Sequence, residues 1–562
     1  MARRAVFSAA MRSPTLLALL ASFVVGCSSS SSGSGAAGTG GAGGSAVAEG
    51  PIPTGTAITI DSGPLAGATD GAVRSWKGIP FAAPPTGANR FRVPQPVSAW
   101  TDPRDASKLG DECPQPNVLN GTFGGGNEDC LFLNVYSPDP APKTGAPVLV
   151  WFHGGAFIVG SAGQALYDGT NLVANTGAVI VTVNYRLGAL GFLSHSALAK
   201  DNPNGEKGNF ALYDQRAAMA WVQRNIHQFG GNPGAVTIFG ESAGGFSVSA
   251  HLTSPDSAPY FQRAIIESGS LAGFDPQPAA AEQQAIDLAA AVGCTGDVIA
   301  CLRGKSPQDL VTNLKNPSPQ PGGLFEGTVR TAVWFPTNDG VFFPISPTEA
   351  FATGKIAKVP TLLGSNKAEG ALFHSGILGD VAVTDQAGYE AALKRTFGDM
   401  TPMIVARYPL ASFAKPDDAL AQIETDAAFT CAARRQARAL TKAGAPVYRY
   451  FFTRKLDSGA IASLGPTHSA ELAYLWGTSD VTFGKVNTDE SMTLTPVMQG
   501  YWTAMAKTGD PNGGSAPTWP KYDVATDPYM TLDVPAVAGA GLAGEVCDFW
   551  DGLPALTLPK SY

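Results

Sequence analysis

The stretch VTIFGESAG, residues 236–244, decides the fold. An apolar, partly β-branched run leads directly into a Gly-x-Ser-x-Gly pattern, which is typical of a serine on a tight turn between a strand and a helix. Because the chain has 66 glycines, the pentapeptide alone is a weak signal, and the strand-like run before it supports the prediction. The alternative interpretation is a serine in an ordinary glycine-rich turn.

Other apolar runs also end in glycine or polar residues. They are Val148–Phe152, Val179–Val183, Ala264–Ile266, Thr361–Leu363 and Val447–Phe452. Runs this apolar suit strands that are buried on both faces, and we expect Val447–Phe452 to be the last of them. Between two of the runs, Asp214–Phe229 has apolar residues at helical spacing and precedes two glycines. The pattern predicts an α/β fold, with a large, mostly parallel central sheet flanked by helices.

A serine nucleophile needs a base, an acid that orients the base, and N–H groups that bind the oxyanion. The stretch His153–Phe157 reads HGGAF and follows a predicted strand, which is typical of an oxyanion loop, although a plain glycine turn is the alternative. Of the six histidines, His374 and His468 follow a late-strand acid, Glu369. Position favours His468, because His374 would share one loop with Glu369.

The N-terminus is typical of an export signal. Three arginines precede an apolar run, Leu16–Val25, and a cysteine, Cys27. We interpret residues 1–26 as a lipoprotein signal peptide and Cys27 as the site of lipid attachment; the alternative is an ordinary signal peptide with an incidental cysteine. Residues 27–55 combine this cysteine with a Ser/Gly/Ala-rich flexible tether. The body would span residues 56–562. The expected location is the bacterial cell envelope (the outer membrane if the host is Gram-negative), and otherwise the protein is secreted.

Composition excludes several classes of function. The net charge is −8 and the chain has no long basic run, which argues against a nucleic-acid partner. No apolar run after the N-terminus reaches the ~18 residues of a spanning helix, so we expect membrane contact through the lipid only. Seven cysteines leave six beyond Cys27, enough for three disulfides with fifteen possible connectivities. Their spacing does not indicate a metal site.

The chain resembles the type B carboxylesterases, the cholinesterase-like branch of the α/β-hydrolases, from about residue 70 to 555. The matching motifs are Lys77–Pro85, Arg90-Phe91, Glu128–Tyr136, Phe239–Gly245, Asp339-Gly340, Asn366–Gly370, Gly465–Leu472, Trp502–Asn512 and Cys547–Trp550.

The resemblance implies a role for each site residue. Ser242 is the nucleophile, His468 the general base and Glu369 the acid that orients it. The oxyanion donors are the N–H groups of Gly155, Ala156 and Ala243, with Ala156 standing where relatives usually have a third glycine. The side chain of Glu241 would lie beside the nucleophile and that of Ser268 behind Glu369. The implied disulfides are Cys113–Cys130, Cys294–Cys301 and Cys431–Cys547.

The resemblance therefore implies a serine carboxylesterase that hydrolyses small-molecule carboxylic esters through an acyl-enzyme, with no metal and no organic cofactor. Two alternatives stay open. One is a non-catalytic binding protein on the same fold, which the presence of all three triad candidates disfavours; the other is an amidase or thioesterase with the same triad.

In cholinesterases, the choline cation lies on a tryptophan in the first disulfide loop. The corresponding loop here, Cys113–Cys130, contains no tryptophan, and Phe123 is its only aromatic residue. We therefore expect a preference for uncharged esters.

Overall fold

The computed structural model describes residues 51–117, 122–274, 277–313, 334–378, 382–478 and 484–553. The expected signal peptide, Cys27 and the tether up to residue 50 lie outside the described residues. The first described strand, β1 (Ala57–Ile60), begins next to Thr56, close to where we expect the body to start. It forms a small sheet with β2 (Gly63–Ala66) and β5 (Arg104–Asp105), and β6 (Gln115–Pro116) pairs with β7 (Phe123–Gly125).

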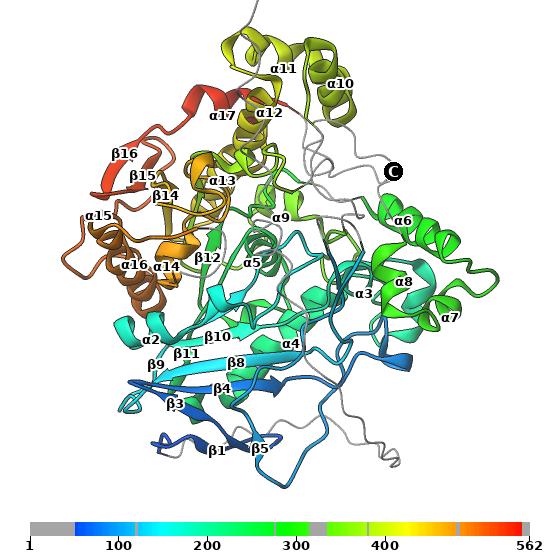
Figure 1. Cartoon of the computed structure of the whole chain (residues 1–562), viewed down its shortest axis with the longest axis vertical. Helices are drawn as coiled ribbons and strands as arrows, with labels where there is room; N and C mark the ends of the chain where they lie inside the picture. The colour runs from blue at the N-terminus through cyan, green and yellow to red at the C-terminus, as the bar shows by residue number, and fades with distance from the viewer. Residues whose placement is uncertain are drawn as a thin grey trace, which may run out of the picture. The chain divides into compact units, whose positions relative to one another are not determined.

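Eleven of the described strands form one large sheet in the order β16-β15-β14-β13-β12-β11-β9-β10-β8-β4-β3 (Figure 1). The seven strands from β15 to β10 in this order pair in parallel, whereas β16 at one edge and β8, β4 and β3 at the other pair antiparallel. The prediction of a mostly parallel central sheet is confirmed. The strands are β3 (Ala68–Asp70), β4 (Val73–Pro80), β8 (Phe132–Pro138), β9 (Ala146–Phe152), β10 (Val179–Val183), β11 (Gly231–Glu241), β12 (Arg263–Glu267), β13 (Thr361–Asn366), β14 (Val447–Phe452), β15 (Pro528–Leu532) and β16 (Val537–Ala540).

The expectation that Val447–Phe452 is the last strand is wrong. This segment is β14, and β15 and β16 follow it at the edge of the sheet. Residues of β15 alternate between buried and half-buried, and β16 is largely exposed. Neither strand is covered on both faces, so neither shows the continuous apolar run by which the buried strands are recognised.

The helices cover both faces of the sheet. Strand β9 shows why: Val148, Val150 and Phe152 pack into one apolar cluster, and Leu149 and Trp151 into another on the opposite face. The first cluster includes residues of α4, α5 and α13, and the second includes residues of α2, α14 and α16. The bounds are α2 (Thr170–Thr176), α3 (Gly188–Phe192), α4 (Phe210–Asn225), α5 (Ala243–Thr253), α6 (Pro278–Ala291), α7 (Val298–Arg303), α8 (Pro307–Thr312), α9 (Pro347–Thr353), α10 (Gln386–Phe397), α11 (Thr401–Arg407), α12 (Pro416–Glu424), α13 (Cys431–Lys442), α14 (Leu472–Trp476), α15 (Asp489–Met492), α16 (Leu494–Thr508) and α17 (Gly544–Asp551).

The helix expected over Asp214–Phe229 exists, with shifted bounds. Helix α4 begins at Phe210, and its last expected turn, Ile226–Phe229, is a 3₁₀ turn. Gly230 then adopts φ 89°, a left-handed conformation that glycine takes without strain.

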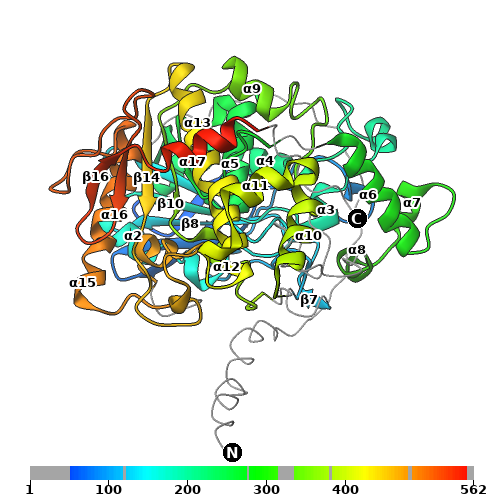
Figure 2. The same ribbon diagram turned by 90° about the horizontal axis from the view of Figure 1, so that it is seen from above.

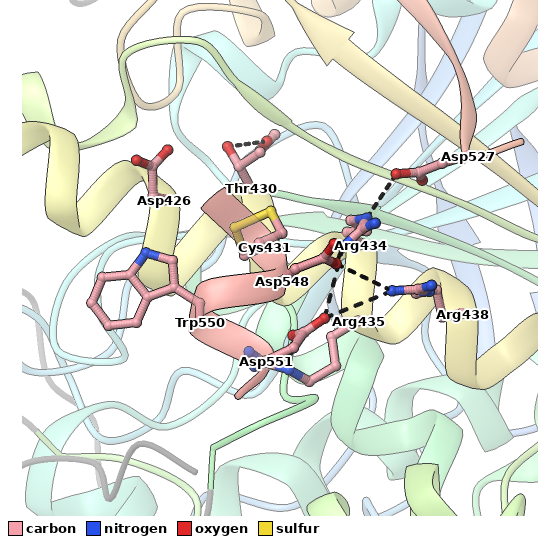
Figure 3. The surroundings of a disulfide bond; sticks show 12 residues. Asp426, Thr430, Cys431, Arg434, Arg435, Arg438, Asp527, Asp548, Trp550 and Asp551 are labelled. Atoms are coloured by element: carbon pink, nitrogen blue, oxygen red, sulfur yellow. Dashed lines mark hydrogen bonds and ion pairs between the residues drawn. A yellow bond between two sulfur atoms is a disulfide. The ribbon is translucent and has the colours of Figure 1, made fainter. Parts of the chain in front are cut away.

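Helices α10, α11 and α12 lie together in both views, and they share a third apolar cluster with the C-terminal helix α17 (Figures 1 and 2). Two further kinds of contact tie α17 to the body. The disulfide Cys431–Cys547 joins it to the first residue of α13 (Figure 3). Arg434, one turn further along α13, pairs with Asp548 on α17 at 2.8 Å.

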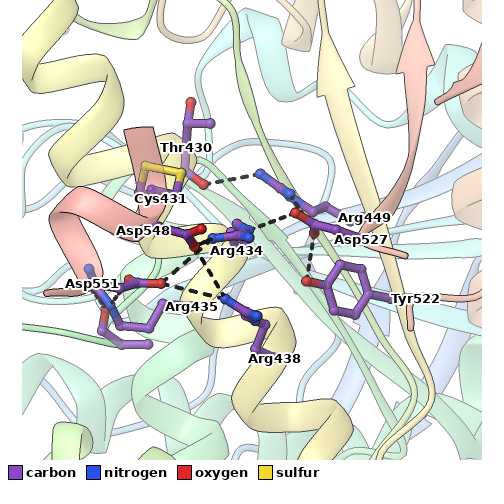
Figure 4. A network of polar contacts seen from close by, with 12 residues as sticks. Thr430, Cys431, Arg434, Arg435, Arg438, Arg449, Tyr522, Asp527, Asp548 and Asp551 are labelled. Atoms are coloured by element: carbon purple, nitrogen blue, oxygen red, sulfur yellow. Dashed lines mark hydrogen bonds and ion pairs between the residues drawn. A yellow bond between two sulfur atoms is a disulfide. The ribbon is translucent and has the colours of Figure 1, made fainter. Parts of the chain in front are cut away.

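The same arginine also reaches the sheet. Nε of Arg434 lies 2.7 Å from Oδ2 of Asp527, and Nη1 of Arg449 lies 3.1 Å from Oδ1 of that carboxylate (Figure 4). The hydroxyl of Tyr522 donates to the same Oδ1 at 2.7 Å. Asp527 immediately precedes β15, so its buried carboxylate connects β14, β15 and α13. The exposed Asp548 extends the network to α17, 114 residues from Arg434.

Candidate active site

Ser242 stands on a strained turn between β11 and α5. Its backbone angles are φ 55° and ψ −122°, a region that residues with a Cβ rarely adopt. The Ser242 N–H donates to the carbonyl oxygen of Glu267 at 2.9 Å, which anchors the turn to β12. A Cβ at Gly240 would lie 2.5 Å from the backbone of Gly244, and one at Gly244 would collide with the carbonyl oxygen of Phe152. Both glycines of the pentapeptide are therefore required for the close approach of the backbone.

His468 and Glu369 are brought together from distant parts of the chain. Glu369 begins a 3₁₀ turn just after β13, and His468 lies in the segment after β14. Nδ1 of His468 lies 2.6 Å from Oε2 of Glu369, and both side chains are buried. The other oxygen, Oε1, accepts hydrogen bonds from the Ser268 hydroxyl at 2.5 Å and from the Asn366 N–H at 2.6 Å. The carboxylate is thus held on one side and free to hold the imidazole on the other.

The opposite nitrogen of His468 faces Glu241, the residue before Ser242. Nε2 lies 3.2 Å from Oε1 of Glu241, and it has no aligned hydrogen-bond partner among the described residues, Ser242 included. The Ser469 hydroxyl donates to the same Glu241 oxygen at 2.7 Å. Since Glu241 and Ser242 are consecutive, the imidazole lies beside the serine turn at the end of β11. Catalytic hydrogen bonds are often long or misaligned before substrate binds.

Two opposing effects set the pKa of His468. Burial by itself lowers it, but the charges of Glu241 and Glu369, together with the hydrogen bond to Glu369, raise it to about 9. Burial also raises the pKa of the Glu241 carboxyl, against the lowering effects of His468 and of the Ser469 hydroxyl. The two carboxylates therefore favour the protonated form of the imidazole.

The predicted oxyanion loop follows β9 and lies against Ser242. Gly155 and Ala156 have φ values of 103° and 52°. A Cβ at the preceding Gly154 would lie 3.2 Å from Cβ of Ser242, so the loop and the serine are in close contact. Ala243 is the first residue of α5, where helix geometry leaves the N–H without an intrahelical acceptor. None of the N–H groups of Gly155, Ala156 and Ala243 donates to an acceptor in the described part of the chain.

His374, the alternative base, pairs with Glu424. Its Nε2 lies 2.9 Å from Oε2 of Glu424, the last residue of α12, and both side chains are buried. Gly370 and the α12 end are also joined, because the Gly370 N–H donates to the Thr425 hydroxyl at 2.9 Å. His374 therefore fastens the loop that carries Glu369 to α12.

Three buried carboxyls near the site were not predicted from the sequence. Glu267 ends β12 and accepts from Nε1 of Trp502 at 2.9 Å; burial raises its pKa to about 8. Glu471 is hydrogen-bonded to the side chain of Asn366, and burial raises its pKa well above the usual range. Burial also raises the pKa of Glu424. Glu471 stands within the histidine motif Gly465–Leu472, which was the available signal; Glu267 and Glu424 had none, because their burial arises from packing.

Other features of the described chain concern disulfides, metal binding and membrane crossing. The three disulfides pair Cys113 with Cys130, Cys294 with Cys301 and Cys431 with Cys547, as the resemblance implied. Disulfides persist in oxidising compartments, which suggests an extracellular or secreted protein. Among the described residues, no cluster of His, Cys, Asp and Glu has the arrangement of a metal site. Within those residues no helix is long and apolar enough to cross a membrane.

Comparisons with known proteins agree with this geometry. The family model described as "Carboxylesterase family" matches residues 54–550. The chain is 35% identical to fumonisin B1 esterase of Sphingopyxis macrogoltabida, with 84% of this chain and 86% of the relative covered. It is 34% identical to para-nitrobenzyl esterase of Bacillus subtilis (85% and 94% covered) and 32% identical to acetylcholinesterase of Bungarus fasciatus (86% and 83% covered).

A solved structure of PNB esterase superimposes with a TM-score of 0.77 at 33% identity, covering 88% of this chain and all of that chain. The architecture described above is thus that of an α/β-hydrolase. The chain belongs to the carboxylesterase family and is a carboxylic ester hydrolase.

Proposed function

We propose that Ser242, His468 and Glu369 are the catalytic triad of this esterase. Oγ of Ser242 attacks the ester carbonyl carbon while Nε2 of His468 takes the hydroxyl proton. Glu369 holds the imidazole through Nδ1 and stabilises the imidazolium that forms. The single observation that supports this assignment best is the 2.6 Å contact between His468 and Glu369 beside the strained Ser242 turn.

The tetrahedral oxyanion accepts hydrogen bonds from the N–H groups of Gly155, Ala156 and Ala243. Donors of this kind each contribute about 3 kcal/mol to the transition state in related sites. His468 then gives its proton to the departing alcohol, which leaves an acyl group on Ser242. A water molecule, deprotonated by His468, attacks the acyl carbonyl, and collapse of the second oxyanion releases the acid and restores the serine. No metal or organic cofactor enters this sequence.

The test is ester hydrolysis by Ser242→Ala and His468→Ala. Each variant should lower kcat by about 10⁵-fold or more, because removal of either group disables the same step. Unchanged circular dichroism and melting temperature would show that the fold is intact. Substantial turnover by Ser242→Ala would refute the assignment.

Family membership shows that the hydrolysed bond is a carboxylic ester. It does not specify the alcohol and acyl groups of the substrate. The relatives are named for a fumonisin ester, a para-nitrobenzyl ester and acetylcholine. For this chain we propose a preference for uncharged esters, since the Cys113–Cys130 loop lacks the tryptophan that binds choline. Matched oxygen ester, thioester and anilide substrates would separate an esterase from a thioesterase or amidase with the same triad.

For location, we propose a lipoprotein with signal peptide 1–26, lipidated Cys27, a tether through residue 55 and the catalytic body 56–562. Radiolabelled fatty acid should be incorporated into the wild-type protein and not into Cys27→Ala. In a Gram-negative host, Ser28 after the cysteine predicts outer-membrane sorting, because aspartate there is the usual retention signal. Recovery of soluble, unlabelled wild-type protein would exclude the anchor.

A further inference from the structure

The imidazole of His468 lies between two carboxylates, and each carboxylate accepts a serine hydroxyl. On the Nδ1 side, Glu369 is held by Ser268 at 2.5 Å. On the Nε2 side, Oε1 of Glu241 lies 3.2 Å from the ring, and the Ser469 hydroxyl donates to this same oxygen at 2.7 Å. The two sides of the base are therefore built alike, although only the Glu369 side is needed to orient it.

Ser469 is held in an unfavourable backbone conformation. It immediately follows His468 and has φ 65°, in the left-handed region that favours glycine. Ser268 has the same peculiarity, with φ 50°. Strain of this kind persists where the surrounding contacts enforce it, and it gathers at functional sites. In Ser469 the strained turn directs the hydroxyl at the carboxylate of Glu241.

We propose that Ser469 is a positioning residue, which keeps the Glu241 carboxylate ionised and directed at Nε2 of His468. The inference rests on the triad proposed above. A hydrogen bond to a buried carboxylate favours its charged form. That charge stabilises the imidazolium that forms when Ser242 is deprotonated, and it also keeps the resting imidazole protonated to a higher pH.

Several titratable groups act on the Glu241 and His468 pair, in addition to Ser469. His468 is influenced by Glu241, Glu369 and Glu424. Glu241 is influenced by His468 and Glu369, and it in turn acts on Glu267, Glu471, Tyr167 and Tyr185. Of the described side chains, only that of Ser469 donates a hydrogen bond to Glu241. Removal of its hydroxyl should therefore favour the neutral form of Glu241.

Ser469→Ala should move the acid limb of the kcat/KM profile to lower pH by about one unit, because the imidazole then loses a neighbouring charge. The kcat on the alkaline plateau should fall about tenfold, since the imidazolium is less stabilised. Ser469→Gly relieves the strain at φ 65° and secures folding, and it should show the same shift. Glu241→Gln should shift the limb in the same direction by at least as much.

The decisive measurement is the double variant Ser469→Ala/Glu241→Gln. If Ser469 acts through Glu241, its hydroxyl has no further effect on the acid limb once the carboxylate is gone. Ser137→Ala is the matched control: it removes a buried serine hydroxyl that donates to the Phe229 carbonyl at 2.6 Å, and its acid limb should match the wild type.

A second readout does not need turnover. In the Ser242→Ala background, the pKa of His468 can be followed by NMR titration of the labelled imidazole, and it should fall on adding Ser469→Ala. The inference is overturned if neither Ser469 variant moves the acid limb or the pKa of His468. It is also overturned if Ser469→Ala moves the acid limb equally in the wild type and in Glu241→Gln. If Ser242→Ala is inactive, those results refute only the role of Ser469 and not the triad. Turnover by Ser242→Ala would instead refute the triad.

Discussion

Glu369 divides its two oxygens between His468 and the rest of the protein. Oε2 lies 2.6 Å from Nδ1 of His468, whereas Oε1 accepts hydrogen bonds from the Ser268 hydroxyl and the Asn366 N–H. Both oxygens of Glu369 therefore act as hydrogen-bond acceptors, and Nδ1 of His468 is the donor. A side chain that placed an N–H opposite Nδ1 would force the histidine into its other tautomer.

The first prediction follows from this arrangement. In Glu369→Gln the amide oxygen should take the place of Oε1, because two donors point there, and the amide N–H would then face Nδ1. Nδ1 must become the acceptor, which places the proton on Nε2, where the base is needed. The kcat should fall by about 10⁴-fold with little change in KM. Ser268→Ala is the comparison and should lose far less; similar losses in the two variants would contradict the tautomer argument.

His374 should matter for stability rather than for catalysis. His374→Ala leaves Glu424 buried without its partner, at a cost of about 2 kcal/mol in the free energy of unfolding. Most esterase activity should remain at temperatures where the variant is folded. Denaturant titration and steady-state kinetics check the two parts. An inactive but folded His374→Ala would mean that the assignment of the base is wrong.

Acid should destabilise the protein through buried neutral histidines. His251 lies between Ser257 and the side chain of Gln215, and burial lowers its pKa to about 3. An unfolded histidine has a pKa near 6.5, so between pH 3 and 6.5 the unfolded state binds more protons and stability falls as the pH falls. Between pH 7 and 5 the loss from His251 alone is about 2 kcal/mol.

Urea titrations at both pH values check this, with His251→Gln as the variant. Glutamine keeps a neutral polar side chain, so the variant should be less stable at pH 7 and should lose less on acidification. The same difference between pH 7 and 5 in both proteins would exclude His251 as a source of the acid sensitivity.

The disulfide between Cys431 and Cys547 should contribute most among the three. It closes a separation of 116 residues, against 7 for Cys294–Cys301. In the loop-entropy model the two are worth about 5 and about 2 kcal/mol. The paired Cys→Ala variants, compared by thermal melting, should rank in that order. In the variant without the Cys431–Cys547 disulfide, the Arg434–Asp548 ion pair still holds α17 against α13. Because salt screens ion pairs, the melting temperature of this variant should depend more on salt than that of the wild type.

Acetylcholine should be a poorer substrate than its uncharged analogue 3,3-dimethylbutyl acetate. The described part of the Cys113–Cys130 loop places Phe123 in β7, half-buried, and the loop sequence has no tryptophan to bind a cation. The ratio of the two kcat/KM values is the measurement. A clear preference for acetylcholine would show that an aromatic residue elsewhere supplies the cation site.

Local patterns in the sequence were enough to predict the class of fold and the tight turn at Ser242. A strand buried on both faces must be continuously apolar, and the run before Ser242 is such a strand, β11. The turn at Ser242 needs small residues at fixed offsets, so Gly240 and Gly244 are readable without a structure. The edge strands β15 and β16 were missed, because a strand covered on one face or neither carries a weaker pattern.

The partners of the two candidate histidines were decided only by the tertiary structure. Position along the chain left His374 and His468 both open, and packing places one against Glu424 and the other against Glu369. The hydrogen bond from Ser469 to Glu241 joins residues 228 apart in sequence, and no local pattern encodes such a contact. The physical reason is that burial and charge act through space: a carboxyl acquires its raised pKa, and a histidine its role, from groups that the fold brings near it.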